Sequence, residues 1–366
     1  MTASPDRPIS VLLVGYGLAG RVFHGPLAST TPGLSVDAIV TSNPHRQAQA
    51  RAAFPEARIY ESADEAWGGG YDLAAIGTAN VTHVPFAAAA LRAGMHVVLD
   101  KPLAPTAAAA EELSALAAEN DRLLIPFQNR RWDSDFRTTL AVSRSGDLGT
   151  IHRFESRMER MRVALKGGWR ESTDPADMGG ALYDLGAHVI DQALLLMGPV
   201  ESVFATSRSV RFPDETDDDA TLLLTHTSGA VSLLVVSLIG PFADPRFVLY
   251  GTRGGLRITA ADTQENVLVA GGLPTPGAEW GREPAGTDAL VVEYDESNAR
   301  TTRALPLQPG DWPHFYAAVE RAIRGLGSPP VLLADVIANL RVLDAARESA
   351  GTGQSVRLDP PAGHHA

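Results

Sequence analysis

The sequence feature that most constrains the fold is a glycine-rich turn close to the N-terminus. Residues Ile9–Val14 form a strand-like run that is apolar except for Ser10, and Gly15-Tyr16-Gly17-Leu18-Ala19-Gly20 follows directly. An apolar, helix-compatible segment comes next, so this G-x-G-x-x-G pattern lies between a strand and a helix. The first glycine of such a turn permits the tight bend, the second lets the backbone approach a pyrophosphate, and the third lets helix and strand pack closely. We therefore predict a dinucleotide site made by Gly15, Gly17, Leu18, Ala19 and Gly20. The alternative is a glycine turn with a structural role only.

The choice of dinucleotide depends on the end of the next predicted strand, residues 36–40. An NAD-binding fold usually places an acidic residue there to hold the ribose 2′-hydroxyl. The segment after this strand, residues 41–46, contains no acid, but it offers the Ser42 hydroxyl and the Arg46 guanidinium. An arginine matches phosphate oxygens well, which favours NADP over NAD. The alternative is that Arg46 is an ordinary residue of a helix surface.

Two further apolar strands, residues 71–77 and 97–99, end in polar residues. Thr78, Asn80 and His83 follow the first, and Asp100-Lys101-Pro102 follows the second. Ligands of open α/β sheets bind outside the carboxyl ends of the strands, so we expect these side chains at the same edge as the glycine turn. Lys101 is then either a proton-transfer group or a surface cap on the sheet. His83, taken alone, is typical of a packing or capping histidine.

The order of predicted elements changes near residue 128. Before it, strands and helices alternate, which predicts an α/β Rossmann domain with a doubly wound parallel sheet over residues 1–128. After it, strands follow one another with short turns, which predicts an α+β domain with an open, mainly antiparallel sheet over residues 129–366. Residues 261–286 are rich in glycine and proline, and we expect an irregular excursion there. Helices are expected at residues 312–324 and 333–349.

One helix of this second domain, residues 181–192, carries a polar stripe on an otherwise apolar segment. Asp184 and His188 are four residues apart and so share one helical face, which Asp191 continues. Buried polar groups are costly unless they have partners. The stripe is therefore either a hydrogen-bonded core histidine or an imidazole oriented by a carboxylate in a cleft.

Composition excludes several classes of function. The net charge is −12 and no dense Lys/Arg stripe is visible, which argues against a nucleic-acid or anionic-membrane surface. The absence of cysteine removes disulfides, thiolate metal sites and cysteine nucleophiles, and no metal site is predicted. No apolar run approaches the ~20 residues needed to span a bilayer. We expect a soluble, cytoplasmic protein.

Taken together, these features resemble the glucose–fructose oxidoreductase/inositol dehydrogenase (Gfo/Idh/MocA) family. That family has the N-terminal glycine motif, a Glu-Lys-Pro motif matched here by Asp100-Lys101-Pro102, and an Asp-x-x-x-His helix matched by Asp184 and His188. Residues 15–24 and 129–136 look like the branch that contains NADP-dependent scyllo-inositol dehydrogenase. The sequence departs from the family at Asp100, where Glu is usual. It also has Ala79 in place of proline in Thr-Pro-Asn, and Gln128 where close relatives often have histidine.

The resemblance implies reversible hydride transfer between a sugar or cyclic polyol and the nicotinamide of NADP, with NAD as the alternative. Lys101 and His188 would share the proton transfer, and Asp184 would orient His188 or bind substrate hydroxyls. Asp100 would hold Lys101 or a substrate hydroxyl. The residues predicted on the cofactor side, besides the glycine turn, Ser42 and Arg46, are Thr78, Asn80, His83, Asp100 and Lys101. The candidates for the sugar-binding wall, each of which could equally be structural, are Arg131, Trp132, Trp169 and Arg170.

The same resemblance implies a homodimer or homotetramer and leaves two other functions open. One is a non-catalytic regulator that senses sugar and dinucleotide, which the loss of Lys101 or His188 would favour; both are present. The other is a glycoside hydrolase that uses tightly held NAD for transient oxidation. Bound cofactor without net reduction would indicate that activity.

Overall fold

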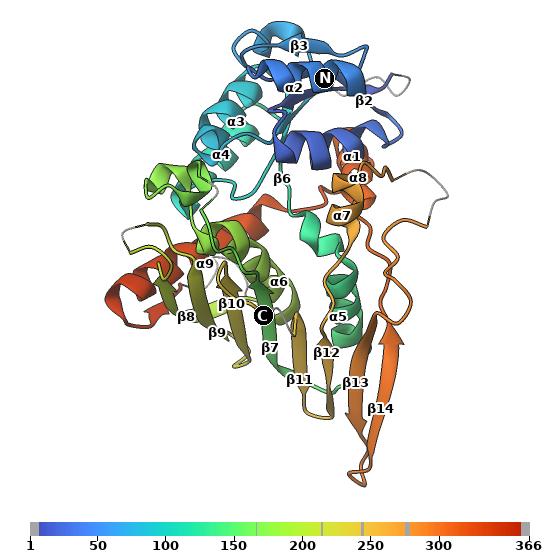
Figure 1. Ribbon diagram of the computed structural model, residues 1–366, viewed down its shortest axis with the longest axis vertical. Helices are drawn as coiled ribbons and strands as arrows, with labels where there is room; N and C mark the ends of the chain where they lie inside the picture. Colours follow the sequence, from blue (N-terminus) through green and yellow to red (C-terminus); the bar gives the residue numbers. More distant parts are fainter. Residues whose placement is uncertain (1–6, 166, 214, 243–244, 275–278, 360–366) are drawn as a thin grey trace. The chain divides into compact units, whose positions relative to one another are not determined.

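The computed structural model describes residues 7–165, 167–213, 215–242, 245–274 and 279–359. Contacts divide the chain into two compact units, one built on a parallel sheet and one on a mixed sheet (Figure 1). The predicted fold class is confirmed. The helices are α1 (Gly25–Ser29), α2 (Pro44–Ala53), α3 (His83–Arg92), α4 (Ala107–Glu119), α5 (Ser134–Ser145), α6 (Ala187–Met197), α7 (Gln264–Val269), α8 (Pro313–Ile323) and α9 (Leu333–Thr352).

The sheet of the first unit contains six parallel strands. In their order across the sheet they are β3 (Arg58–Tyr60), β2 (Leu34–Val40), β1 (Ile9–Val14), β4 (Leu73–Ile76), β5 (His96–Leu99) and β6 (Leu124–Pro126). The strand order reverses between β1 and β4, which makes their carboxyl ends the point where a doubly wound sheet binds ligands. All four residues of β4 are buried, as expected for a strand covered on both faces.

The first unit is not continuous in sequence. It comprises Met1–Asn129 and two later segments, Thr263–Trp280 and Asp311–Val336. A single boundary after residue 128, as expected from the sequence, leaves these two later segments out of the first unit. The reason is an aromatic cluster: Phe315 of α8 packs edge-on against Phe127 at 4.9 Å between ring centroids. Apolar side chains far apart in sequence therefore share one core. The roles assigned to residues 1–128 and 129–366 stay predictions.

The second unit contains a nine-stranded sheet. Its strands, in order, are β14 (Arg300–Pro306), β13 (Asp288–Tyr294), β12 (Gly254–Ile258), β11 (Phe247–Gly251), β7 (Ile151–Glu159), β10 (Val231–Ser237), β9 (Asp219–His226), β8 (Val200–Arg208) and β15 (Val356–Arg357). All neighbours pair antiparallel except β7 and β10, which are parallel. The sequence analysis missed the β13–β14 hairpin. It also missed α7, which lies within the irregular segment expected at residues 261–286. Residues 275–278 of that segment lie outside the described residues.

Burial along the strands of this sheet alternates with a period of two. Leu222 and Leu224 of β9 are fully buried, whereas Leu223 between them is exposed, and Phe204 of β8 is exposed as well. Helices α5 and α6 pack against the sheet (Figure 1). Alternation of this kind is typical of an antiparallel sheet with one face in the core and the other toward solvent.

A buried arginine connects the helices of the second unit to its sheet. The Arg246 guanidinium donates hydrogen bonds to Ser156 Oγ of β7 (2.7 Å) and to Gln192 Oε1 of α6 (3.1 Å). It also faces Asp135 of α5, with 3.5 Å between Nε and Oδ2. Burial raises the pKa of Asp135 to about 6, against the lowering effect of Arg246. One cation therefore links α5, α6 and β7.

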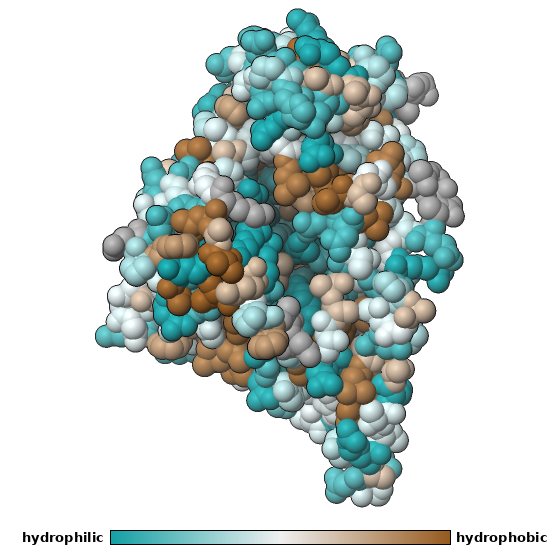
Figure 2. Space-filling view, viewed as in Figure 1, coloured by the Kyte–Doolittle hydropathy of each residue, from teal (hydrophilic) through white to brown (hydrophobic). Residues whose placement is uncertain are grey.

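Apolar side chains also reach the surface, as Figure 2 shows for one face of the molecule. In the second unit, loops next to β7, β8 and β10 carry several of them. Met161 forms a backbone bridge with Ile239, and the Arg211 guanidinium donates a 2.8 Å hydrogen bond to the carbonyl oxygen of Arg162. The exposed apolar residues of these loops are Met161, Val163, Leu165, Val210, Phe212 and Phe242. These loops thus present apolar side chains to solvent.

Candidate functional site

The glycine turn lies at the carboxyl end of β1 and requires glycine at two positions. Gly15 has a φ of +95°, and a Cβ added there would lie 2.8 Å from the carbonyl oxygen of Gly77. A Cβ on Gly20 would lie 1.9 Å from the carbonyl oxygen of Gly15. Gly17 is different, because a Cβ there would meet only Arg46 Nη1, at 3.8 Å. The turn is therefore closed on its protein side and open at Gly17, where backbone can approach a phosphate.

Replacing Gly20 with alanine is expected to destabilise the first unit. The added methyl group would overlap backbone atoms that cannot rotate away, and overpacking of this kind costs about 1–3 kcal/mol or more. Urea unfolding measures the loss. Gly68→Ala is the matched control, because nothing lies within 4 Å of its added Cβ. Equal stability of the two variants would contradict the close packing of the turn.

A π-helical turn, Ala19–His24, follows the glycines, with the amide of Gly25 donating to the carbonyl oxygen of Gly20. A second π-helical turn, Leu182–Gly186, precedes α6. Turns of this type are rare in proteins, and many of those that occur lie at functional sites. The first contains the predicted cofactor residues Ala19 and Gly20, and the second contains Asp184 and leads into α6, which carries His188.

Arg46 lies in the first turn of α2, beside the glycine turn. Asn43 caps this helix by accepting a 3.1 Å hydrogen bond from the Arg46 amide. The Arg46 side chain is exposed, and its Nη1 approaches the open side of Gly17. Ser42, one residue before the cap, is also exposed. The two groups predicted to bind a 2′-phosphate therefore lie at the end of β2, next to the predicted pyrophosphate turn.

Thr78 and Asn80 follow β4. Thr82 Oγ1 donates to the carbonyl oxygen of Ala79 at 2.7 Å, so the 2.6 Å contact between Thr78 Oγ1 and Thr82 Oγ1 is donated by Thr78. Asn80 is 3% exposed. This loop packs against the glycine turn, because a Cβ on Gly15 would lie 2.8 Å from the Thr78 methyl group. The loop and the turn form one edge, as predicted.

Asp100 and Lys101 follow β5 at this same edge. The Asp100 amide donates to the carbonyl oxygen of Ile76 at 3.0 Å, and Asp100 Oδ1 accepts a 2.8 Å hydrogen bond from the Lys101 amide. Both side chains are half-buried, and the Lys101–Pro102 peptide bond is cis. The carboxylate thus fixes the backbone on which the lysine stands.

His83 is 1% exposed and serves the same segment. Its Nδ1 lies 2.8 Å from the carbonyl oxygen of Pro102, and because a carbonyl oxygen only accepts, Nδ1 carries the hydrogen. Burial lowers the pKa of His83, so the ring is neutral near pH 7. This geometry favours a clamp on the Lys101–Pro102 segment for His83, in addition to the cofactor contact that was predicted.

In the second unit, the predicted polar stripe has partners from other elements. Asp191 and Arg131 form a buried two-point ion pair, with hydrogen bonds of 2.8 and 2.7 Å. Asp184 accepts from Arg160 Nη2 at 3.3 Å, and His188 is 5% exposed. Any ligand contact of Arg131 is therefore made by a guanidinium that Asp191 already holds in place.

The remaining predicted wall residues lie on short 3₁₀ turns of the second unit. Trp132 ends the turn Asn129–Trp132 and is half-buried. Arg170 is exposed and stacks on the Trp169 ring at 4.1 Å from the ring centroid. An arginine on an indole gives a flat polar and aromatic surface of the kind that sugars contact, but the pair is also a stable surface contact in itself.

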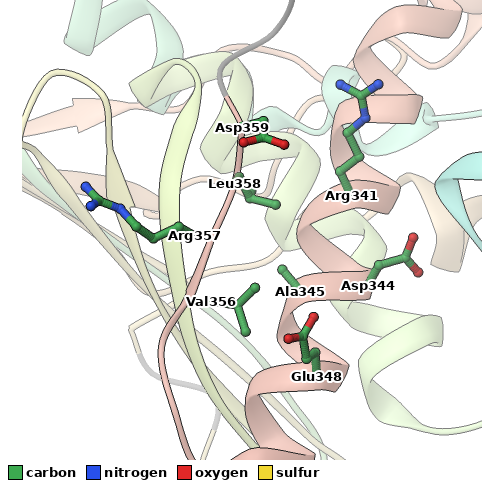
Figure 3. Close-up of a pocket in the computed structure, with 8 residues that line it drawn as sticks. All are labelled: Arg341, Asp344, Ala345, Glu348, Val356, Arg357, Leu358 and Asp359. Atoms are coloured by element: carbon green, nitrogen blue, oxygen red, sulfur yellow. The ribbon is translucent and has the colours of Figure 1, made fainter.

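A cavity of about 570 Å³ lies elsewhere, between α9 and the C-terminal strand β15 (Figure 3). None of the predicted site residues lines it. Its lining residues are Arg341, Asp344, Ala345, Glu348, Val356, Arg357, Leu358 and Asp359. Throughout the described part of the chain, no helix is long and apolar enough to cross a bilayer, and no group of three His, Asp or Glu residues could hold a metal ion.

Two family models match the chain. A model described as an oxidoreductase family with an NAD-binding Rossmann fold matches residues 9–127, and a GFO/IDH/MocA C-terminal domain matches residues 136–257. These matches cover the parallel sheet and a large part of the mixed sheet.

Individual relatives align along nearly the whole chain. An uncharacterised oxidoreductase of Escherichia coli, YdgJ, is 34% identical over 93% of this chain and 96% of its own. The scyllo-inositol 2-dehydrogenase (NADP(+)) IolW of Bacillus subtilis is 31% identical over 96% of both chains. The solved structure of the Bacillus subtilis protein yvaA superimposes with a TM-score of 0.92 at 30% identity, covering 98% of this chain and 100% of its own. The chain belongs to the Gfo/Idh/MocA family of oxidoreductases, whose N-terminal domain is an NAD-binding Rossmann fold.

Proposed function

We propose that the protein is an NADP-dependent dehydrogenase that interconverts a hydroxyl of a sugar or cyclic polyol and the corresponding carbonyl group. The observation that carries the proposal is the edge of the parallel sheet, where the open glycine turn, the Thr78–Asn80 loop and Asp100–Lys101 follow three adjacent strands. The name of the IolW relative, an NADP-dependent inositol dehydrogenase, supports the same substrate class.

The residues of this edge fit a nicotinamide dinucleotide. Backbone at Gly17 has room for a pyrophosphate, and Arg46 next to it suits a 2′-phosphate. Thr78 and Asn80 would complete the cofactor side. A bound nicotinamide cofactor would supply the hydride acceptor for oxidation, or the donor for reduction, at C4 of its ring.

The chain itself must bind the substrate hydroxyls and move one proton. In the oxidation direction, a base takes the proton of the reacting hydroxyl as the carbon loses its hydride. Lys101 Nζ and the His188 imidazole are the two candidate bases. Asp100 holds the backbone of Lys101, and Asp184 would orient His188 or accept from a substrate hydroxyl.

Absorbance of the reduced nicotinamide tests the proposal directly. A panel of sugars and inositols is supplied to the purified protein with NADP and then with NAD. We expect turnover with at least one cyclic polyol or sugar, and faster turnover with NADP. Protein that retains cofactor through purification, cleaves glycosides and gives no net reduction would contradict the proposal and favour the hydrolase.

Arg46→Ala is expected to weaken NADP binding by about 10- to 100-fold and to leave NAD binding nearly unchanged. A hydrogen bond to a charged group contributes about 1.5–3 kcal/mol, and only NADP carries the 2′-phosphate. Fluorescence titration gives both dissociation constants. Arg51→Ala is the matched control, since Arg51 is exposed on the same helix. An equal loss for both cofactors in Arg46→Ala would remove the argument for NADP.

A further inference from the structure

His24 is a fully buried polar residue to which the mechanism above gives no role. It ends the π-helical turn that follows the glycines and is 0% exposed. Phe127 packs on it at 4.3 Å between ring centroids, and a Cβ on Gly77 would lie 3.0 Å from its Cδ2. The sheet edge therefore leaves room for an imidazole between a strand end and an aromatic ring, a costly place for a polar group unless its nitrogens are used.

One nitrogen of His24 has a partner from the far end of the chain. Nδ1 lies 2.8 Å from the hydroxyl oxygen of Tyr316, which is fully buried on α8. Burial lowers the pKa of His24 to about 4, so the imidazole is neutral near pH 7 and carries one hydrogen. Burial also raises the pKa of Tyr316 far above its usual value, so the phenol keeps its proton.

These two facts determine the tautomer of His24. Within the described part of the chain, Nδ1 is the one acceptor in reach of the Tyr316 hydroxyl, so the phenol donates to Nδ1. The ring hydrogen is then on Nε2. Nε2 makes no hydrogen bond to a described residue, and Asp100 Oδ2 lies 4.0 Å from it. A neutral N–H donor thus faces the carboxylate that holds the Lys101 backbone.

We propose that His24 and Tyr316 are positioning residues for the reaction: the Nε2–H of His24, fixed by the Tyr316 hydroxyl, holds the Asp100 carboxylate and through it the backbone of Lys101. The inference rests on the proposed function. The 4.0 Å separation is longer than a hydrogen bond, and contacts of this kind tighten when substrate and cofactor bind.

His83 acts on the other side of the same segment. It donates from Nδ1 to Pro102, whereas His24 donates from Nε2 toward Asp100. Two neutral imidazoles in opposite tautomers therefore direct their N–H groups at Asp100 and Pro102, the residues on either side of Lys101.

Three variants test the proposal through kcat and KM. His24→Phe keeps an aromatic ring and removes both nitrogens, so we expect kcat to fall about 10- to 100-fold while the KM for NADP stays within about two-fold. His24→Gln offers an amide N–H near the position of Nε2 and should recover most of this loss. Tyr316→Phe removes only the hydroxyl that fixes the tautomer and should lower kcat less than His24→Phe. Thermal unfolding of each variant identifies losses that follow from stability alone.

A second measurement needs no turnover. Nitrogen-15 NMR of the histidine side chains should show His24 of the wild-type protein as the Nε2–H tautomer, with a weaker preference in Tyr316→Phe. An Nδ1–H tautomer would overturn the proposal, as would wild-type kcat in a folded His24→Phe variant. A fall in kcat that follows thermal stability and that His24→Gln does not restore would also overturn it. If wild-type protein turns over no sugar or polyol, the proposed function fails instead, and the tautomer result still stands.

Discussion

Replacing Lys101 with alanine is expected to lower kcat by about 10²–10⁴-fold, the range for loss of a general acid or base. The side chain stands at the carboxyl end of β5, and Asp100 fixes its backbone. Cofactor binding should survive, because the glycine turn and Arg46 are untouched. Stopped-flow or steady-state absorbance gives kcat, and fluorescence titration gives the dissociation constant of NADP.

Lys101→Arg separates proton transfer from positive charge. A guanidinium stays protonated in proteins, whereas an ammonium can release its proton when its surroundings favour it. If Lys101 moves the proton, the arginine variant should be nearly as slow as the alanine variant. Only two of the 31 lysine and arginine residues in the sequence are lysines, so an amine is an unusual side chain in this chain and one of the two occurs at position 101. Near-normal turnover in Lys101→Ala would remove Lys101 from the chemistry and leave His188 as the base.

Replacing Arg246 with methionine is expected to lower the free energy of unfolding at pH 8 by about 3–5 kcal/mol, the usual cost of removing one partner of a buried ion pair. Methionine fills much of the space but leaves Asp135, Ser156 and Gln192 without the cation that faces them. Urea unfolding followed by circular dichroism measures the change. Arg208→Met is the matched control: Arg208 is paired with Asp219 but is 65% exposed, so its loss should cost less than about 1 kcal/mol.

The cost of Arg246→Met should depend on pH through Asp135. Burial raises the pKa of this carboxyl to about 6 in the folded protein, above its ordinary value near 4. As pH falls, Asp135 is therefore protonated at a higher pH in the folded state than in the unfolded state. Its contribution to stability is greatest below about pH 4 and is lost as pH rises through about 6. Without Arg246 the ionised form is still less favourable, so the variant should recover part of its stability as pH falls toward 5. Adding Asp135→Asn to Arg246→Met should recover part of the loss at pH 8, and a deficit that is independent of pH would contradict this account.

The first unit shows how far local sequence patterns reach. The strand before the glycines was predicted with the bounds it has, and the residues after β4 and β5 lie at the edge where they were expected. Periodicity and turn chemistry act over a few residues, and parallel strands place their carboxyl ends together, so these inferences need no tertiary information. The β13–β14 hairpin was within reach of the same reasoning, because the apolar run Ala289–Val292 precedes a turn at Asp295–Asn298.

Partners distant in sequence could not be predicted in this way. His24 was visible as a polar residue in the apolar run after the glycines, but its partner Tyr316 lies 292 residues later. The pairing of Arg131 with Asp191, 60 residues apart, was equally hidden, because no local pattern relates the two residues. The return of α8 to the first unit has the same origin, since nothing near Phe315 indicates that it packs on Phe127.

The sequence by itself determined the parallel sheet of the first unit, the dinucleotide-binding glycine turn, and the position of Lys101 at the carboxyl end of β5. Those conclusions follow from steric rules that act along the chain: glycine where a Cβ would overlap backbone, and apolar runs where a strand is covered on both faces. Only the tertiary structure decided that His24, Tyr316 and His83 pack next to Asp100 and Lys101. The protonation state and role of a buried nitrogen depend on the polar atoms that packing places within reach of it.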